Sequence, residues 1–337
     1  MHWTGTATFE GESVNDQRSD LRIGIHSGQQ HTDFASTVGL WRHAEDLGYD
    51  WASVFDHYIP ISGNPDGPIY DAFTWLSALA ASTTRLRCGI IVVNLLWRNP
   101  GMLAKMATTI DHVSGGRLEL GLGAGAAGAE QSQFDVPTGA LGERMDRLDE
   151  TIQVLRALWT QPRTTFKGRY CRIEDAIAEP KPIQERLPIW VGGMGEKRTL
   201  RIVAERADGW NAFAPTVEMY RSKLAVLEGH CRAVGRDPAE IRKQIVIRTM
   251  LGADEREVAE RATSEGFGTD IAQTRLSPPD DPALTCTPEQ LVEQLVPFVD
   301  VGVRDFLLLA RPPADLRTIE LFATNVAPAL REHVRSH

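Results

Sequence analysis

This chain of 337 residues has few cysteines, no long apolar run and no excess of positive charge. Its four cysteines, Cys88, Cys171, Cys231 and Cys286, lie far apart and form no CxxC pair, which argues against a disulfide framework or a zinc site. No run approaches the roughly 20 apolar residues of a membrane-spanning helix. The 36 Lys and Arg against 45 Asp and Glu give a net charge of −9. Because nucleic acids and anionic membranes attract basic surfaces, we expect neither as a partner.

Several catalytic motifs are absent as well. The chain contains no HExxH, no GxSxG and no His, Asp and Glu cluster with metal-ligand spacing, so metallohydrolase and serine-triad chemistry are disfavoured and no metal is expected. Residues 1–20 are polar and have no apolar segment of a signal peptide. We expect a flexible N-terminal arm over 1–20, a single domain over 21–337 and a cytoplasmic protein.

Short apolar runs alternate with amphipathic helical segments along the rest of the chain. The run 86–93 is continuous and rich in β-branched residues, as in a strand buried on both faces. Eight such runs predict an α/β fold, a (β/α)8 TIM barrel, rather than a doubly wound sheet. We expect insertions after strands 4 and 7, namely a small hairpin over 163–175 and an irregular loop over 267–286. The predicted strands are 21–26, 51–56, 86–93, 117–123, 187–191, 209–213, 244–250 and 304–310.

Polar residues that follow predicted strands are the first candidates for a site, because barrel enzymes place function at the carboxyl ends of their strands. Asp56 and His57 end the second strand, and imidazole exchanges a proton near neutral pH. His57 is therefore a candidate to bind or protonate a substrate, and the alternative is a histidine that caps the next loop. His26, Ser27 and Trp97, beside the first and third strands, are candidate substrate contacts.

Two glycine-rich segments also follow strands. Gly123–Gly128 matches GxGxxG, but it follows the fourth strand and no acidic second strand comes after it, which disfavours a dinucleotide fold. Glycine and alanine there would let a flat ligand lie against the backbone. Gly192–Thr199 follows the fifth strand and opens a helix predicted from Glu196. Its backbone N–H groups, with Lys197 close by, are typical of a phosphate site, although Glu196 disfavours an anion; the alternative is a glycine turn needed only for packing.

Four segments together resemble the bacterial luciferase-like monooxygenase superfamily, a group of flavin and deazaflavin barrels. They are Asp56-His57, 98–125, 141–159 and 187–211, and the resemblance covers most of 21–330. The last two, with 67–81, are most similar to the coenzyme F420-dependent oxidoreductases. This resemblance implies hydride transfer between the deazaflavin C5 and a small carbonyl, alcohol, imine or enone, in a homodimer. The alternatives are an FMN-dependent monooxygenase and a flavin-binding barrel without catalysis.

The resemblance also implies roles for individual residues. A non-prolyl cis peptide at Ile91-Val92 would support the central ring of the cofactor, and Asp56 and His57 would lie beside C5. In relatives an acidic residue or Trp-His often follows Gly-Ala-Gly, where this chain has Ala126-Ala127. That departure motivates the alternative without catalysis. The remaining implied cofactor contacts are Asn94, Ala124 and Gly125 at the ring, and Gly192, Gly193, Met194, Gly195, Glu196 and Lys197 at the phosphate arm.

Overall fold

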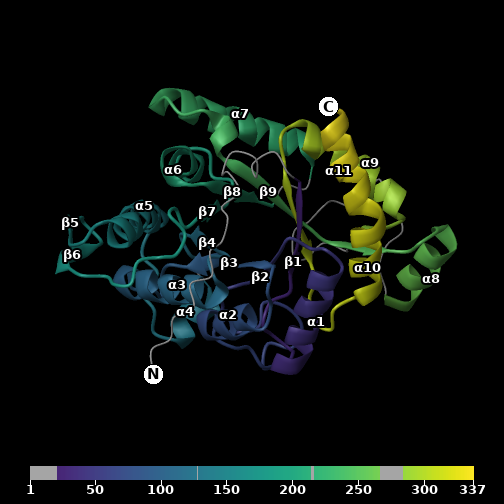
Figure 1. Ribbon diagram of the computed structural model, residues 1–337, viewed down its shortest axis with the longest axis horizontal. Helices are drawn as coiled ribbons and strands as arrows, with labels where there is room; N and C mark the ends of the chain where they lie inside the picture. The colour runs from purple at the N-terminus through teal and green to yellow at the C-terminus, as the bar shows by residue number, and fades with distance from the viewer. Residues whose placement is uncertain (1–20, 127, 214–215, 266–283) are drawn as a thin grey trace, which may run out of the picture.

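The strands form a closed parallel barrel, which confirms the predicted (β/α)8 fold (Figure 1). The computed structural model describes residues 21–126, 128–213, 216–265 and 284–337. Around the barrel the strands follow the order β1-β12-β9-β8-β7-β4-β3-β2. Their bounds are β1 Arg22–His26, β2 Trp51–Val54, β3 Arg87–Asn94, β4 Leu118–Gly123, β7 Ile189–Gly192, β8 Gly209–Ala212, β9 Arg242–Ile247 and β12 Asp305–Leu309.

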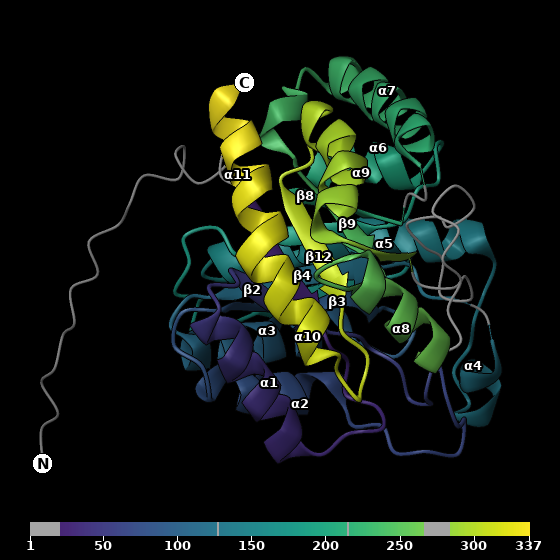
Figure 2. The same ribbon diagram turned by 90° about the vertical axis from the view of Figure 1, so that its right-hand side faces the viewer.

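Helices cover the outside of the barrel, and Figure 2 shows α10, α11 and α9 against β12 and β9. Among the described residues, none of these helices is long and apolar enough to cross a membrane. Their bounds are α1 Phe34–Asp46, α2 Ala72–Ala81, α3 Pro100–Ser114, α4 Ala129–Gln133, α5 Leu141–Thr160, α6 Thr199–Arg206, α7 Val217–Val234, α8 Glu255–Glu265, α9 Pro288–Asp300, α10 Leu316–Leu321 and α11 Ala327–Ser336, with a 3-10 turn at Pro238–Glu240 and a π-helical turn at Phe322–Val326.

Local capping explains where several helices begin. The side chains of Asp33, Asp71 and Asn99 each accept backbone N–H groups in the first turns of α1, α2 and α3. The helix α6 begins at Thr199, so the predicted start at Glu196 was too early. Residues 196–198 form a turn instead, and they lengthen the loop between β7 and α6.

The inside of the barrel is a packed apolar core. Trp51 and Trp190 stack there with their ring centroids 6.2 Å apart. Two glycines make room for them: a Cβ on Gly24 would lie 2.4 Å from Trp51 Cδ1, and one on Gly209 would lie 2.2 Å from Trp190 Cε3. The interior cluster consists of Trp51, Ile91, Trp190, Val246 and Leu307, and the neighbouring residues along each strand face the helices.

Five charged side chains lie at the N-terminal end of the barrel, and we name them the arginine network: Arg22, Arg87, Glu119, Arg242 and Asp305. Glu119 accepts hydrogen bonds from Arg22 Nη1 at 2.7 Å and from Arg87 Nε. Asp305 accepts from Arg22 Nε at 2.6 Å and from Arg242 Nε at 2.8 Å. Burial opposes ionisation of Glu119, but Arg22 and Arg87 hold its pKa well below the usual range.

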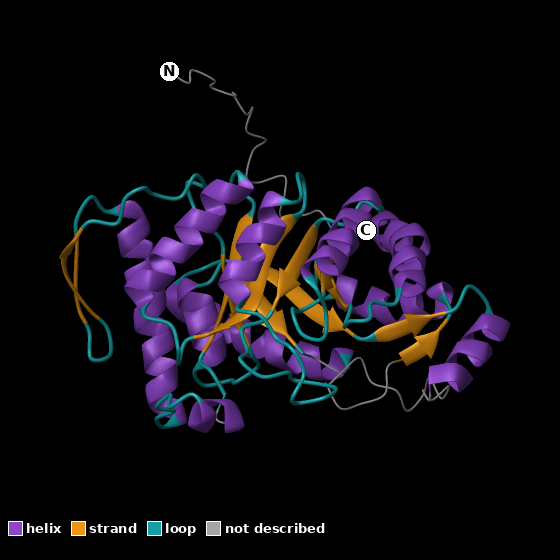
Figure 3. Ribbon diagram, turned by 90° about the horizontal axis from the view of Figure 1, so that it is seen from below, coloured by secondary structure: helices purple, strands orange, loops and turns teal. Residues whose placement is uncertain are grey.

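Two small sheets lie outside the barrel (Figure 3). The predicted hairpin is confirmed as β5 Thr164–Lys167 and β6 Arg172–Ala176, which project from one side of the molecule. The predicted strand 244–250 is interrupted at Arg248 and continues as β10 Thr249–Leu251, which pairs with β11 Leu284–Cys286. The prediction of irregular structure up to 286 was therefore wrong for its last three residues, while 267–283 and the N-terminal arm lie outside the described residues.

Candidate active site

Asp56 ties together the carboxyl ends of β2 and β3. Its side chain is 1% exposed and accepts hydrogen bonds from Arg98 Nη2 at 2.5 Å and from the Asn94 backbone N–H at 3.1 Å. Arg98 also donates to Asp71 at 2.8 Å and so reaches the start of α2. Burial raises the pKa of Asp56 above its usual value, and the Arg98 guanidinium opposes the increase. These contacts are those of a positioning residue.

His57 follows Asp56 and meets an acid that the sequence did not single out. Its Nδ1 lies 2.9 Å from Glu130 Oε2. The other oxygen of Glu130 accepts the backbone N–H groups of Tyr58 at 2.6 Å and Ile59 at 3.1 Å. The side chain of His57 is 33% exposed, whereas that of Glu130 is 11% exposed. Glu130 therefore holds both the imidazole and the loop that carries it, and the ring remains accessible.

His26 lies inside the barrel mouth as an uncharged ring. Its Nδ1 is 2.8 Å from the hydroxyl of Ser53, its partner residue on β2. Burial, together with the nearby Arg311 and His57, lowers the pKa of His26 to about 3. Ser27, in contrast, faces α1, since its hydroxyl accepts the indole N–H of Trp41 at 3.0 Å. The structure thus places Ser27 away from the barrel interior.

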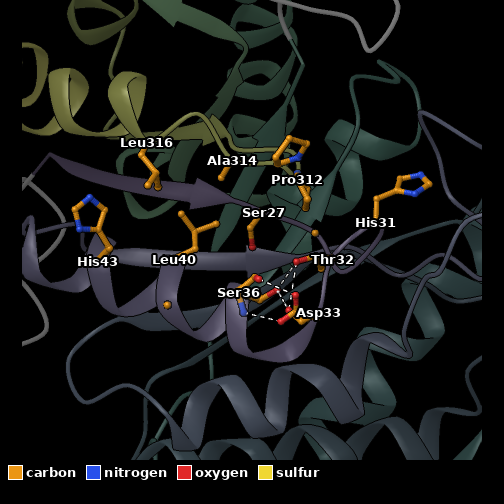
Figure 4. Close-up of a pocket in the computed structure, with 14 residues that line it drawn as sticks. Ser27, His31, Thr32, Asp33, Ser36, Leu40, His43, Pro312, Ala314 and Leu316 are labelled. Carbon is orange, nitrogen blue, oxygen red and sulfur yellow. Dashed lines mark hydrogen bonds between the residues drawn. The ribbon is translucent and has the colours of Figure 1, made fainter.

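A pocket of about 420 Å³ lies on that outer side of Ser27, between α1 and residues 312–316 (Figure 4). Its acidic residue, Asp33, is fully used as a helix cap: it accepts from the backbone N–H of Ser36 at 2.8 Å and from its hydroxyl at 2.7 Å. The carbonyl of Asp33 accepts from Thr37. The polar groups of this pocket therefore build the start of α1.

Aromatic side chains connect the loops above β2, β3 and β4. Tyr58 stacks on Trp97 with ring centroids 4.4 Å apart, and Phe134, just after α4, packs 5.0 Å from Tyr58. Trp97 is half-buried. The predicted substrate contact Trp97 is thus part of the cluster that places the His57 loop beside α4.

The end of β3 has the predicted irregularity. The peptide bond Ile91-Val92 is cis, as the resemblance implied, and the pairing of β3 with β4 shifts at this point. Val92 occupies space left by glycines on β4 and β7: a Cβ on Gly123 would lie 2.6 Å from Val92 Cγ2, and one on Gly192 would lie 2.8 Å from Val92 Cγ1. The absence of a side chain at Gly123 therefore makes room for Val92.

Residues beyond Gly123 pack against the end of β3. Gly125 has φ of +77°, a conformation that favours glycine, and a Cβ there would lie 2.4 Å from Asn94 Oδ1. Asn94 is 7% exposed, and its side-chain oxygen accepts the backbone N–H of Leu96 at 3.1 Å. Ala124 lies between them, half-buried. Asn94, Ala124 and Gly125 are thus brought together as expected.

The loop from Gly192 to Lys197 presents backbone N–H groups without a protein partner. Within the described part of the chain, the N–H groups of Met194, Gly195, Glu196 and Lys197 donate to no protein acceptor. The Glu196 carboxylate lies 2.6 Å from Lys223 Nζ on α7, which lowers the pKa of Glu196. Its negative charge is thereby paired, so the objection that Glu196 disfavours an anion at this loop is weakened.

Sequence reasoning missed two residues of this site, Arg98 and Glu130. Glu130 follows Gly125 by five positions, so an acid close to the Gly-Ala-Gly segment was the available signal. It lies 73 residues from His57 along the chain, and only the fold brings the two together. Among the described residues, no group of three or more His, Cys, Asp or Glu could hold a metal ion.

The chain belongs to the luciferase-like monooxygenase family, whose family model matches residues 19–280. Among curated relatives, the F420-dependent glucose-6-phosphate dehydrogenase of Nocardia farcinica is 28% identical, over 93% of this chain and 98% of that protein. The enzyme of the same name from Segniliparus rotundus is 29% identical, over 92% of this chain and 98% of its own.

Solved structures share the fold at lower identity. An F420-dependent secondary alcohol dehydrogenase in complex with an F420-acetone adduct has a TM-score of 0.76 at 21% identity, covering 92% of this chain and 99% of that chain. A riboflavin lyase with modified FMN has a TM-score of 0.76 at 17% identity, covering 93% and 92%. The fold is therefore common to proteins with either cofactor and does not by itself choose between them.

Proposed function

We propose that this protein is an F420-dependent oxidoreductase that transfers a hydride between C5 of the deazaflavin and a small organic substrate such as an alcohol or carbonyl compound. Its relatives of matching length are F420-dependent dehydrogenases, and the match extends over 92–93% of the chain. The observation that carries the proposal is the pair His57–Glu130, with Nδ1 and Oε2 2.9 Å apart at the carboxyl end of β2. A base held by a carboxylate is what an alcohol or carbonyl substrate needs for its proton.

The residues present fit the cofactor. The N–H groups of Gly195, Glu196 and Lys197, which lack a protein acceptor in the described chain, would bind the phosphate of its side arm. Asn94 and Ala124 would lie along the ring. Bound F420 supplies two-electron hydride chemistry, and the protein supplies binding, orientation and proton transfer.

The contacts of His57 define its part in the reaction. A carboxylate at Nδ1 favours the tautomer with a proton on Nδ1, which leaves Nε2 to exchange a proton with the substrate. In alcohol oxidation the neutral ring accepts the hydroxyl proton at Nε2, and in carbonyl reduction the protonated ring donates it. Glu130 orients the ring through Nδ1 and holds the loop through the N–H groups of Tyr58 and Ile59.

Glu130 also weakens the alternative of a barrel without catalysis. That alternative was motivated by the missing acid at Ala126-Ala127. Glu130 brings a carboxylate to the same end of the barrel and into contact with His57. Under this proposal, the acid at 130 serves the imidazole, not the substrate directly.

Cofactor titration tests the proposal. The apo protein is titrated with F420 and with FMN, and binding is followed by fluorescence. We expect saturable F420 binding, followed by reoxidation of bound reduced F420 by a panel of ketones and aldehydes in stopped flow. Tight FMN binding without F420 binding favours the monooxygenase alternative, and F420 binding without turnover favours a barrel that only binds the cofactor.

A homodimer is part of the same proposal. Apolar side chains are exposed along α3, with Met102 at 64% and Val113 at 45%. Ile183, which is 54% exposed, lies two residues after Lys181. The backbone carbonyl of Lys181 is 2.8 Å from Nε2 of His112 on α3, so this segment lies beside the helix. We propose these exposed apolar side chains as part of the dimer interface. Light scattering should give twice the mass of the chain, and Met102→Lys should reduce it to one.

A further inference from the structure

Two arginines end neighbouring strands at the mouth of the barrel. Arg248 follows β9 and Arg311 follows β12 after one residue, and these strands pair with Leu308 opposite Ile247. The next strand, β1, pairs with β12 so that His26 lies opposite Leu309. The carboxyl ends of β9, β12 and β1 are therefore level and adjacent.

Arg248 and Arg311 lie just beyond the strand ends, and continuing the alternation of β9 and β12 places both at inward positions. Leu307 lies in the interior cluster and Leu309 packs against it, so Arg311 is the next inward position of β12. Val246 lies in the same cluster, whereas Ile247 belongs to the outer layer, so Arg248 is the next inward position of β9. Both side chains are half-buried.

Arg311 and His57 lie on opposite sides of His26 at the barrel mouth, since β1 lies between β12 and β2 in the barrel. Arg311 and His57 both lower the pKa of His26, which lies on the strand between them in the barrel order. Because His26 is buried and uncharged, the positive charge on this side of the mouth comes from Arg248 and Arg311. On the other side, the acids Asp56 and Glu130 are engaged by Arg98 and by His57 with the backbone.

We infer that Arg248 and Arg311 bind an anionic group of the substrate, a phosphate or a carboxylate, while its reacting carbon lies at His57. This inference rests on the proposed function, because it places the reaction at His57. Both guanidinium groups also interact with other groups of the protein. Each has five N–H donors in a planar fork, so it can keep such a contact and still donate to anion oxygens. The substrate class is thus small phosphorylated or carboxylated alcohols and carbonyl compounds.

The test is anion binding to the F420-loaded protein, in which the cofactor fills the loop from Gly192 to Lys197. Inorganic phosphate and, in a second arm, acetate are titrated at constant ionic strength, and the melting temperature is recorded. We expect a saturable rise for the wild type. The double variant Arg248→Gln, Arg311→Gln should need at least about tenfold more anion, the size of losing a charge-assisted hydrogen bond. The control Arg201→Gln, on the exposed face of α6, should match the wild type.

Each outcome decides the inference. Equal responses of the wild type and the double variant to both anions overturn the inference. If the double variant loses its response to phosphate alone, the site binds phosphate, and if it loses its response to acetate alone, the site binds a carboxylate. If the double variant does not fold, Arg248→Lys and Arg311→Lys keep the charge but lose the fork, and should bind each anion more weakly. Failure of F420 to bind contradicts the proposed function alone. The apo proteins share the loop from Gly192 to Lys197, so their comparison still decides the anion site.

Discussion

The two ends of the barrel use charge differently: the arginine network lies on the strands, whereas His57 lies in the loop after β2 and Glu130 lies on α4. At the N-terminal end, Glu119 is 2% exposed and is held by two arginines and by the indole N–H of Trp190 at 2.7 Å. At the carboxyl end, Glu130 holds His57, whose side chain is 33% exposed. The first end has charges that neutralise one another, and the second keeps an ionisable ring accessible. Under the proposed function, the charges that stabilise the fold and the groups that take part in the reaction lie at opposite ends of the barrel.

Breaking the arginine network should give the largest effect on stability. In Glu119→Gln the guanidinium group of Arg87 loses its counter-charge and that of Arg22 keeps only Asp305, and breaking a buried pair costs about 3–5 kcal/mol. We expect urea unfolding to show that loss, while F420 affinity of the folded fraction stays close to that of the wild type. A control is Arg163→Gln, which removes an exposed ion pair with Asp175 and should cost less than about 1 kcal/mol. Equal losses in the two variants would contradict the role assigned to the network.

Removing the imidazole at the opposite end should lower turnover and spare stability. His57→Ala deletes the proton-exchanging group, and loss of acid–base help lowers turnover by about 10²-fold or more. Since the ring is partly exposed, the free energy of unfolding should change by less than about 1 kcal/mol. Single-turnover reoxidation of reduced F420 measures the change in turnover, and urea unfolding measures the change in the free energy of unfolding. Unchanged turnover would remove His57 from the mechanism.

The sequence predicted the barrel because each strand is a local apolar run, as 86–93 illustrates with β3 at Arg87–Asn94. It did not predict β11, whose three residues form a strand only by pairing with β10, or the five-residue helix α4. Such short elements carry too little periodicity to be recognised, and tertiary contacts decide them.

The sequence likewise predicted part of the candidate site but not all of it. His57 was identified from its place after a strand, and the cis bond at Ile91-Val92 from the family resemblance. The partners were missed because they come from other loops: Arg98 lies 42 residues and Glu130 lies 73 residues from the groups that they contact. Spacing along one strand or helix contains no information on such pairs.

Replacing Glu130 by its amide tests how this acid acts on His57 at the carboxyl end of the barrel. In Glu130→Gln the amide oxygen can still accept from Tyr58 and Ile59, but the NH2 group donates to Nδ1 of His57 and moves the ring proton to Nε2. We expect turnover to fall about tenfold, within the range for a disturbed general base. The ¹⁵N shifts of the His57 ring should report the tautomer directly. Glu143→Gln on α5, whose carboxylate caps only the Ala140 N–H, is the matched control and should leave both readouts unchanged.

The smallest expected effect is a pH dependence of stability from His26. Its pKa is about 3 in the folded protein, against an ordinary value of 6.5, so the unfolded chain binds the proton more readily. The stabilisation is therefore fully present above pH 6.5 and decreases as the pH falls toward 3. Between pH 7 and pH 5.5 the wild type should lose about 1 kcal/mol more than His26→Gln, which keeps a polar group near Ser53 but does not titrate. Parallel pH profiles for the two proteins would show that folding does not lower the pKa of His26, and would contradict the effect of burial on this ring.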